Sequence, residues 1–160
     1  HDVGRPDDQG YPIRGMIRGD YLYLKNFETE RWPAGNPETG YMNVDGSPTK
    51  TEVLKAKHNK ETAYYWQLSF GKRKAEELYN IRKDPDCMVN LAEMPEYETL
   101  KRKLEKEMTL RLVEQEDPRM FGRGGLFDKY PDMSPAHQFW NRTEAGEKVR
   151  SGWVNPTDFQ

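Results

Sequence analysis

Two short runs of strand-forming residues near the start of the chain predict a β-hairpin, although apolar and polar positions do not alternate cleanly within them. Residues 13–18 and 21–25 are short runs rich in Ile, Leu, Tyr and Met, and the Gly19-Asp20 pair between them suits a tight two-residue turn. In the second run tyrosines alternate with leucines, so the two kinds of side chain face opposite sides of a sheet. Both faces of the hairpin are therefore expected to be covered.

Three further elements are expected in the middle of the chain. Ser47-Pro48-Thr49 can cap a short helix that runs to about Lys57. A second helical stretch extends from Glu61 to near Gly71, where the glycine ends it. Residues 77–81 have the composition of a third strand, which a turn then ends.

The clearest element is a helix from Pro95 or Glu96 to about Glu116. Its apolar residues recur every three or four positions, as on one face of a helix, and a proline suits the first turn. This stripe consists of Tyr97, Leu100, Leu104, Met108 and Leu112. We expect it to pack on the sheet, against Leu22 and Leu78, because helices of this kind are stabilised by burying their apolar face.

Two segments have no regular period. Residues 28–48 are a long loop, and residues 122–160 form a loose tail with several glycines, prolines and scattered aromatic residues. The aromatic residues expected at an exposed tail surface are Phe139, Trp140, Trp153 and Phe159, with Tyr21 and Tyr23 beneath them. The whole pattern predicts an α+β protein with a small antiparallel β-sheet of about four strands, a long C-terminal helix packed across it and an extended irregular tail.

Composition predicts a small apolar core. Leu, Ile, Val and Phe together account for 27 of the 160 residues, whereas 19 residues are Trp, Tyr or Phe, which disordered chains avoid. We therefore expect a folded piece of a longer protein, completed by packing against another domain. The net charge of -2 argues against polycationic binding of nucleic acid. No apolar run approaches the ~18 residues that a membrane span requires, and no signal peptide is predicted.

No grouping of residues predicts catalysis or a metal centre in this chain. Cys87 is the single cysteine, so an internal disulfide is excluded, and its neighbours fit neither a redox CxxC pair nor a metal pair. The three histidines are far apart in the sequence and lack zinc-ligand spacing. Asp84-Pro85-Asp86 resembles the start of a calcium loop, but Met88 replaces the third ligand, so a turn is predicted instead.

Basic residues interleaved with aromatic residues are the strongest signal for a ligand. In the N-terminal third these residues are Arg5, Arg14, Arg18 and Arg31, with Tyr11, Tyr21, Tyr23 and Trp32. Guanidinium groups beside aromatic faces suit sugar rings that carry anions, although an ordinary strand surface is an equally good interpretation. The run Lys72-Arg73-Lys74 suits a sulfate or phosphate, but a solvated surface run is more common.

Residues 78–92 resemble one protein family. The pattern ELYN-x-x-KDPD-x-x-x-NLA, followed by a helix, is similar to the C-terminal subdomain of the type I sulfatases. Within that family, Tyr11-Pro12-Ile13-Arg14 and the strand 21–27 are similar to the heparan N-sulfatases (N-sulfoglucosamine sulfohydrolases). The resemblance implies that residues 1–121 are this subdomain and that residues 122–160 are a tail packed on it or on a partner.

The resemblance also implies an activity that this chain alone does not complete. The parent enzyme would hydrolyse sulfuric esters or N-sulfamates of heparan-type glucosamine, and this subdomain would complete its substrate cleft. The family's Cys/Ser-x-Pro/Ala-x-Arg signature, whose first residue becomes the formylglycine nucleophile, is absent, as are the calcium-binding Asp pairs of the N-terminal domain. We therefore expect an inactive chain with no cofactor of its own, while the parent enzyme uses calcium and formylglycine.

The partners and location follow from the same resemblance. They are the N-terminal catalytic domain of the same sulfatase and a sulfated glycan, in the periplasm, outside the cell or in the lysosome. No nucleic acid and no membrane are expected as partners. Without the catalytic domain, the exposed surface would be covered either by self-association or by the tail folding back on its own sheet.

The predicted substrate-binding residues are His1, Asp2 and Arg14, because the N-terminal loop borders the substrate pocket in the heparan N-sulfatase-like group. His1 and Arg14 suit sulfate or carboxylate oxygens, and Asp2 suits a sugar hydroxyl or an amine. Two other classes of function stay open: a stand-alone glycan- or anion-binding module, and a packing or oligomerisation domain.

Overall fold

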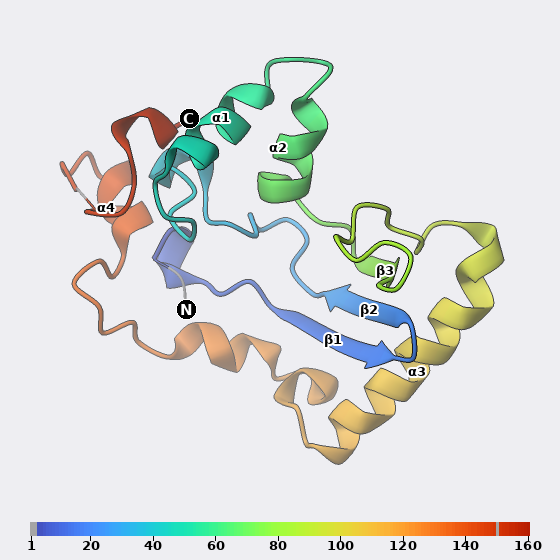
Figure 1. The fold of residues 1–160 in the computed structure, drawn as a ribbon. Coiled ribbons are helices and arrows are strands. Elements are labelled where there is room, and N and C mark those ends of the chain that lie inside the picture. The colour runs from blue at the N-terminus through green and yellow to red at the C-terminus, as the bar shows by residue number, and fades with distance from the viewer. Residues whose placement is uncertain (1–2, 150) are drawn as a thin grey trace. The chain divides into compact units, whose positions relative to one another are not determined.

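The computed structural model describes residues 3–149 and 151–160 (Figure 1), so the predicted substrate-binding residues His1 and Asp2 lie outside the described part. Its contacts divide the chain into two units. The first, which we call the loop unit, comprises His1–Tyr11, Thr29–Arg73 and Phe127–Gln160. The second, which we call the sheet unit, comprises Pro12–Glu28 and Lys74–Leu126. Each unit is described by itself.

The sheet unit contains a three-stranded antiparallel sheet in the order β1-β2-β3. Its strands are β1 (Ile13–Arg18), β2 (Tyr21–Asn26) and β3 (Glu76–Asn80). The predicted hairpin is confirmed, and Gly19 in its turn has a φ of +58, which glycine adopts without steric cost. The described residues hold three strands where about four were expected.

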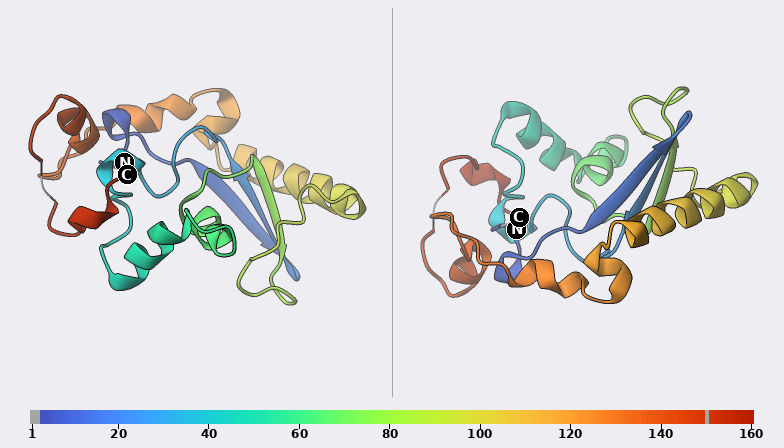
Figure 2. Two further views of the ribbon diagram at one scale, coloured as in Figure 1. Left: turned by 90° about the horizontal axis from the view of Figure 1, so that it is seen from above. Right: turned by 90° about the horizontal axis from the view of Figure 1, so that it is seen from below.

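A long helix covers one face of this sheet. After a 3-10 turn at Pro95–Tyr97, helix α3 (Glu98–Glu114) runs along the sheet, as the two views of Figure 2 show. Its residues Leu104 and Met108 are buried in one core with residues of the sheet, and Tyr97, Leu100 and Leu112 pack around that core. The predicted α+β architecture, with a long helix across a small antiparallel sheet, is confirmed.

The helix packs on tyrosine side chains of β2 and not on Leu22. Tyr23 lies opposite Leu78 in the β2–β3 pairing, and both are fully buried in the core under α3. Leu22 lies opposite Tyr79, and these two residues face the other side of the sheet. The expectation for Leu22 was therefore wrong by one residue, which in a strand moves a side chain to the opposite face. Tyr21 also packs against this core, so both tyrosines lie under α3.

Polar side chains hold the turn that joins β3 to α3. Asn80 Oδ1 accepts hydrogen bonds from the amides two and three residues after it, at 3.2 and 3.0 Å. The Asp84 carboxylate accepts from the amides four and five residues after it, at 3.0 and 2.8 Å. Cys87 lies in this turn with a φ of +53, and its amide donates to Asp84 O at 3.1 Å. The sequence pattern that resembles the sulfatases is therefore, in structural terms, a strand–turn–helix connection.

The loop unit is built from short helices around an aromatic core. The helices are α1 (Pro48–Ala56), α2 (Ala63–Phe70) and α4 (Phe139–Glu144). Besides Pro95–Tyr97, the described residues form short 3-10 turns at Pro6–Asp8, Pro37–Thr39, Pro118–Phe121, Gly124–Lys129 and Pro156–Asp158. Ser47 caps α1 as predicted, because its side chain accepts from Lys50 N at 3.1 Å. No helix in the described part of the chain has the length and apolar character needed to cross a membrane.

The core of the loop unit consists of Ala34, Tyr41, Leu54 and Phe70, with Trp32, Val53 and Trp66 packed against it. Its aromatic rings meet edge to face or tilted. The Tyr41 and Phe70 ring centroids are 4.8 Å apart, and Trp32 lies 6.1 Å from Tyr41 and 6.3 Å from Trp66. These separations are typical of favourable aromatic pairs.

The tail contributes to the loop unit in a way that the sequence analysis anticipated only in part. Phe139 is 1% exposed, so the expectation that it lies at an exposed surface was wrong. Trp153 and Phe159 are 43% and 40% exposed, as expected. The Asp8 carboxylate accepts from Gln138 N at 2.8 Å with each oxygen, which fixes the start of α4 against the N-terminal loop.

Candidate functional site

The basic and aromatic residues of the N-terminal third belong to different units and have different roles. Arg14, Arg18, Tyr21 and Tyr23 lie in the sheet unit, and Arg5, Tyr11, Arg31 and Trp32 lie in the loop unit.

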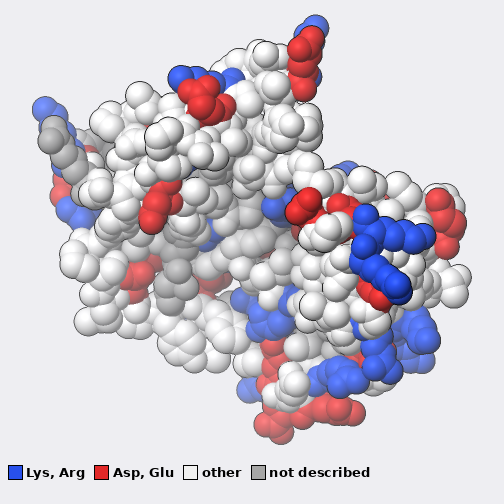
Figure 3. Space-filling model, viewed as in Figure 1, with Lys and Arg blue, Asp and Glu red and all other residues white. Residues whose placement is uncertain are grey.

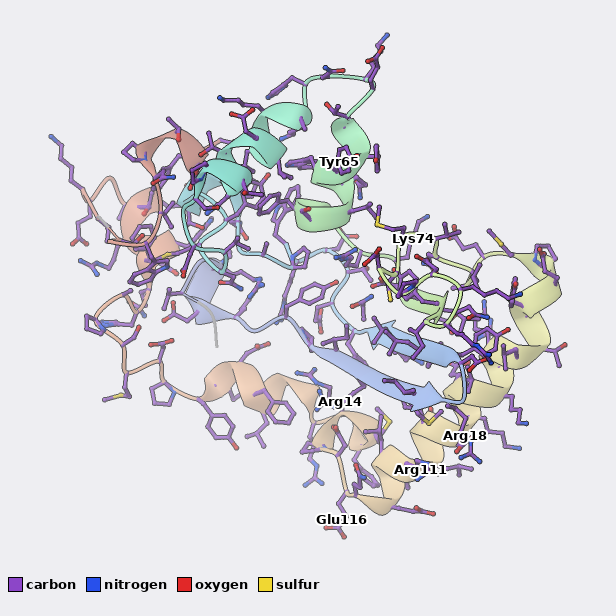
Figure 4. All side chains as sticks on the ribbon, viewed as in Figure 1. Arg14, Arg18, Tyr65, Lys74, Arg111 and Glu116 are labelled. Atoms are coloured by element: carbon purple, nitrogen blue, oxygen red, sulfur yellow. The ribbon has the colours of Figure 1, made fainter. Side chains whose placement is uncertain are left out.

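The arginines of β1 contribute to packing in the sheet unit. Arg14 Nε donates to Asp117 Oδ2 at 2.5 Å, and Arg18 lies 3.7 Å from Glu107 of α3. Figure 4 labels both arginines, on the side of β1 that faces the helix. Burial tends to raise the pKa of Asp117, but the hydrogen bonds from Arg14 and from Arg119 N outweigh it and keep that pKa below its usual value. A role of Arg14 in substrate binding stays a prediction.

Ion pairs frame the helix side of the sheet unit. Lys25 Nζ lies 2.8 Å from Glu105, Arg102 Nε 2.8 Å from Glu98, and further pairs follow along α3. Figure 3 shows positive and negative side chains interspersed over α3. This surface is a solvated network of opposite charges, which is typical of an exposed helix and does not favour an anionic ligand.

A small hollow in the loop unit combines arginines with an indole. It has a volume of about 210 Å³ and is lined by Arg5, Pro6, Gln9, Glu30, Arg31, Trp32 and Asn36. These residues come from the N-terminal loop and from the start of the long loop after β2. The hollow is therefore the part of the loop unit where the interleaved pattern of arginines and aromatic residues becomes a single surface.

Arg5 holds the two loops of this hollow together. Its side chain donates to Trp32 O at 2.5 Å, to Pro33 O at 2.7 Å and to Gln9 O at 3.1 Å, and the residue is only 1% exposed. The guanidinium also lies 5.7 Å from the centroid of the Tyr11 ring. Because its donors serve main-chain carbonyls, Arg5 contributes the shape of the hollow and a nearby positive charge.

Arg31 forms the second fixed cation. Its Nη2 lies 2.9 Å from Asp128 Oδ2, and its Nη1 donates to Asp128 Oδ1 at 3.1 Å and to Gly10 O at 2.8 Å. Such a two-pronged pair has a defined geometry and orients the guanidinium plane. Asp128 also accepts from Gly10 N at 3.2 Å, so this carboxylate joins the tail to the N-terminal loop.

Lys72 lies beside the indole of Trp32, next to the hollow, and forms an ion pair with Glu30. Lys72 Nζ lies 5.6 Å from the centroid of the Trp32 ring and 3.0 Å from Glu30 Oε2. The Lys72 and Glu30 side chains are 40% and 94% exposed, and such solvent-exposed pairs are weak. Lys72 therefore has a weakly paired ammonium group beside the Trp32 ring.

Sequence reasoning identified Arg31 and Trp32 but missed the pairing of Lys72 with Glu30. These two residues are 42 positions apart, and no local pattern links them. The basic run that contains Lys72 is not one site, since Lys74 Nζ instead pairs with Glu93 at 3.2 Å in the sheet unit. The only sequence signal for Lys72 was membership of this run.

Cys87, in the sheet unit, is not an activated thiol. Burial raises the pKa of the Cys87 thiol, and the nearby Asp84 and Asp86 carboxylates raise it further, so the reactive thiolate is disfavoured. The calcium implied for a sulfatase does not fit the described residues, among which no group of three or more His, Cys, Asp or Glu side chains could hold a metal ion.

No protein-family model matches the chain, and no curated protein matches it either.

Proposed function

We propose that this chain is the C-terminal subdomain of a sulfatase that acts on sulfuric ester or N-sulfamate groups of heparan-type glucosamine. In the parent enzyme the formylglycine nucleophile and the calcium ligands belong to the N-terminal catalytic domain. This chain completes the substrate cleft, with His1, Asp2 and Arg14 as its substrate-binding residues, and is inactive alone. The parent enzyme works in the periplasm, outside the cell or in the lysosome.

The observation that carries this proposal is the connection between β3 and α3. The pattern ELYN-x-x-KDPD-x-x-x-NLA lies on that connection, and its polar members Asn80, Asp84 and Asn90 all bond the main chain of the turn or of β3. These three positions therefore have specific structural roles, which supports treating the pattern as the signature of a fold.

A stand-alone glycan- or anion-binding module is the second candidate. The hollow beside Trp32 favours it, because an aromatic wall lies next to Lys72, whose carboxylate partner is exposed and exchangeable. This hypothesis needs no further domain. It predicts affinity of this chain alone for sulfated sugars.

Activity and the reading frame test the first proposal. The purified chain should not hydrolyse an aryl sulfate or glucosamine N-sulfate above a buffer blank. The reading frame upstream of residue 1 should encode a Cys/Ser-x-Pro-x-Arg motif, and the longer protein should hydrolyse one of these substrates. Turnover by the chain alone, or an upstream frame without the motif, would contradict the sulfatase proposal.

Binding of heparin oligosaccharides, measured by calorimetry at low and high salt, tests the second candidate. Lys72→Gln should weaken binding and Glu30→Gln should strengthen it, because these changes remove a cation and a competing carboxylate from the same place. Lys55→Gln is the matched control, since Lys55 and Glu52 form a comparably exposed pair on α1 at 2.8 Å. Absence of binding, or equal effects at the two lysines, would eliminate the hollow as a glycan site.

A further inference from the structure

The two edges of the three-stranded sheet are finished differently. On the β3 edge, Asn90 Oδ1 accepts from Leu78 N at 2.9 Å, and Asn90 Nδ2 donates to Glu76 O at 3.2 Å. The next amide, Leu91 N, donates to Leu78 O at 2.8 Å. Residues 90–91 thus bond the outward groups of β3 as a further strand would, and this edge is closed.

The hydrogen bond from Phe27 N to Pro12 O, at 3.1 Å, identifies which main-chain groups of β1 point away from β2. It continues the β1–β2 register, in which main-chain bonds join alternate pairs of an antiparallel ladder. The residues of β1 that bond β2 are therefore Arg14, Met16 and Arg18. The residues between them, Ile13, Gly15 and Ile17, turn their N–H and C=O groups to the outer edge.

This outer edge is open in the described part of the chain. No hydrogen bond joins the outward main-chain groups of Gly15 or Ile17 to any other described residue, and Ile13 O accepts one from the Arg14 side chain of the same strand. Ile13 and Ile17 are 39% and 64% exposed. Proteins usually protect an edge strand with lysine, proline, a bulge or a covering segment, as residues 90–91 cover β3. Here the outward residues are two β-branched side chains and a glycine.

We propose that β1 pairs with β1 of a second copy of this chain, antiparallel and centred on Gly15, to form one continuous sheet. Ile13 of one copy then lies opposite Ile17 of the other on the same face, and every outward N–H and C=O group of the strand finds a partner. The strand is self-complementary, which is what a two-fold symmetric interface requires.

Charge selects this register over its neighbours. The outward residues of the two copies must face each other, so the pairing can shift only in steps of two residues. A shift in one direction places Arg14 opposite Arg14, and a shift in the other places Arg14 opposite Arg18. Like charges directly opposite each other destabilise a strand pair. In the centred register Arg14 lies opposite Met16 and Arg18 opposite Pro12, so no two arginines lie directly opposite each other.

Gly15 suits the centre of this interface. A Cβ atom at this position would come within 2.6 Å of Leu24 Cδ2, so the glycine lets the leucine of β2 occupy the space over the middle of the strand. The paired isoleucines then lie on either side of that leucine, on the face of the sheet opposite α3. This face gains apolar contacts that a single copy leaves exposed.

Sedimentation equilibrium of the whole chain, from micromolar to millimolar loading, tests the proposal. The wild type should show a reversible monomer–dimer equilibrium. Ile17→Lys should weaken it about tenfold or more, because an edge lysine opposes strand pairing. Ile17→Pro should do the same, since it deletes an outward N–H and leaves the bonds to β2 intact. Leu110→Lys is the matched control. Leu110 is 55% exposed on α3, so this variant also replaces an exposed aliphatic side chain with lysine, but away from the sheet edge.

A monomeric mass at every concentration would overturn the proposal, as would a dimer that Ile17→Lys leaves unchanged. Association lost on Phe159→Lys instead would assign the interface to the tail. The register has its own test. In a Cys87→Ser background, the pair Ile13→Cys and Ile17→Cys should give, on oxidation, bonds between position 13 of one copy and position 17 of the other. Bonds between identical positions in equal yield would overturn the centred register.

Discussion

The loop unit depends more on buried polar side chains than the sheet unit does, although Asn26, Glu77 and Lys101 are also almost fully buried in the sheet unit. In the sheet unit the apolar stripe of α3 packs on Tyr23 and Leu78. Most of these core residues recur at the regular spacing of a helix or a strand. In the loop unit, charged and polar side chains that are almost fully buried connect segments far apart in the sequence. They are Arg5, Asp8, Thr39, Lys50 and Asp158.

Lys50 illustrates the buried polar contacts of the loop unit. Its Nζ donates to Val44 O at 2.6 Å and to Gly40 O at 2.7 Å, and lies 3.3 Å from Asp158 Oδ2 near the end of the chain. Burial lowers the pKa of Lys50, and the Asp158 carboxylate offsets part of that effect. The difference between the units teaches that a thin apolar core can be supplemented by buried polar groups, but each such group then becomes indispensable, because its partners have no water to replace it.

The largest effect is expected for Lys50→Met. It leaves the Asp158 carboxylate buried without its cation and the carbonyls of Gly40 and Val44 without their donor, and breaking such a buried pair costs ~3–5 kcal/mol. Hydrogen exchange should show lost protection in residues 40–58 and 153–160, with α3 still protected. Equal loss in both units would show that they unfold as one, and the comparison would fail.

Two further variants sharpen this prediction. Lys55→Met on the same helix removes an exposed pair with Glu52 and should cost ~0–1 kcal/mol. The double change Lys50→Met with Asp158→Leu should recover only part of the loss, because the carboxylate is gone but the carbonyls still lack a donor. Full recovery would mean that the ion pair, and not the carbonyl contacts, holds this segment.

Leu104→Ala tests the sheet unit in the same way. Leu104 is 1% exposed in the core under α3, and truncating such a leucine costs ~2–5 kcal/mol. The urea midpoint of unfolding should fall, and hydrogen exchange should place the loss in the sheet unit. Leu110→Ala, at a position 55% exposed on the same helix, is the control and should change the midpoint little. Equal midpoints for the two variants would contradict the packing of the stripe.

The same contrast explains what the sequence could and could not predict. The hairpin, the Ser47 cap and the stripe of α3 depend on neighbours within a few residues, so their patterns are visible locally. Helix α4 has six residues and no apolar period, and its start is fixed by Asp8, which is 130 positions away from Gln138. Leu22 was placed under α3 because a run of alternating tyrosines and leucines does not say which set faces the helix.

The same distinction between local patterns and distant contacts applies to the candidate site. Arg31 and Trp32 could be found because arginines next to aromatic residues are a recognisable pattern. The pairing of Lys72 with Glu30, and the use of Arg5 to hold Trp32 O and Pro33 O, depend on how distant loops meet, for which the sequence carries no period.

A smaller effect is expected for Asn90→Ala, where the sheet unit uses a polar residue as the loop unit does. The change leaves Leu78 N and Glu76 O without the partners that close the β3 edge, at a cost of ~1–3 kcal/mol. Urea unfolding measures the cost. Asn80→Ala is the control, because its bonded amides are exposed and water can replace the lost acceptor. A larger loss for the control would mean that the β3 edge does not depend on Asn90.

The smallest expected effect is a difference in the sign of pH dependence between Asp8 in the loop unit and Asp117 in the sheet unit. Burial raises the pKa of Asp8 above 3.8, against the opposing bond from Gln138 N. The pKa of Asp117 lies below 3.8, because its bonds from Arg14 and Arg119 N outweigh burial. Asp8 in the folded state thus holds its proton more tightly than in the unfolded state, and Asp117 holds it less tightly.

Opposite contributions to stability follow. As the pH rises from 3.8 through the folded pKa of Asp8, the stability contributed by that residue falls, and acidification restores it. The stability contributed by Asp117 is fully present above 3.8 and is lost as the pH falls through its folded pKa. Urea unfolding at several pH values should therefore show that the two stability differences, wild type minus Asp8→Asn and wild type minus Asp117→Asn, change in opposite directions as the pH falls. The gap between wild type and Asp117→Asn should shrink on acidification, whereas wild type should gain relative to Asp8→Asn. Slopes of the same sign would mean that the two folded pKa values are shifted in the same direction, which would contradict the opposite shifts expected for Asp8 and Asp117.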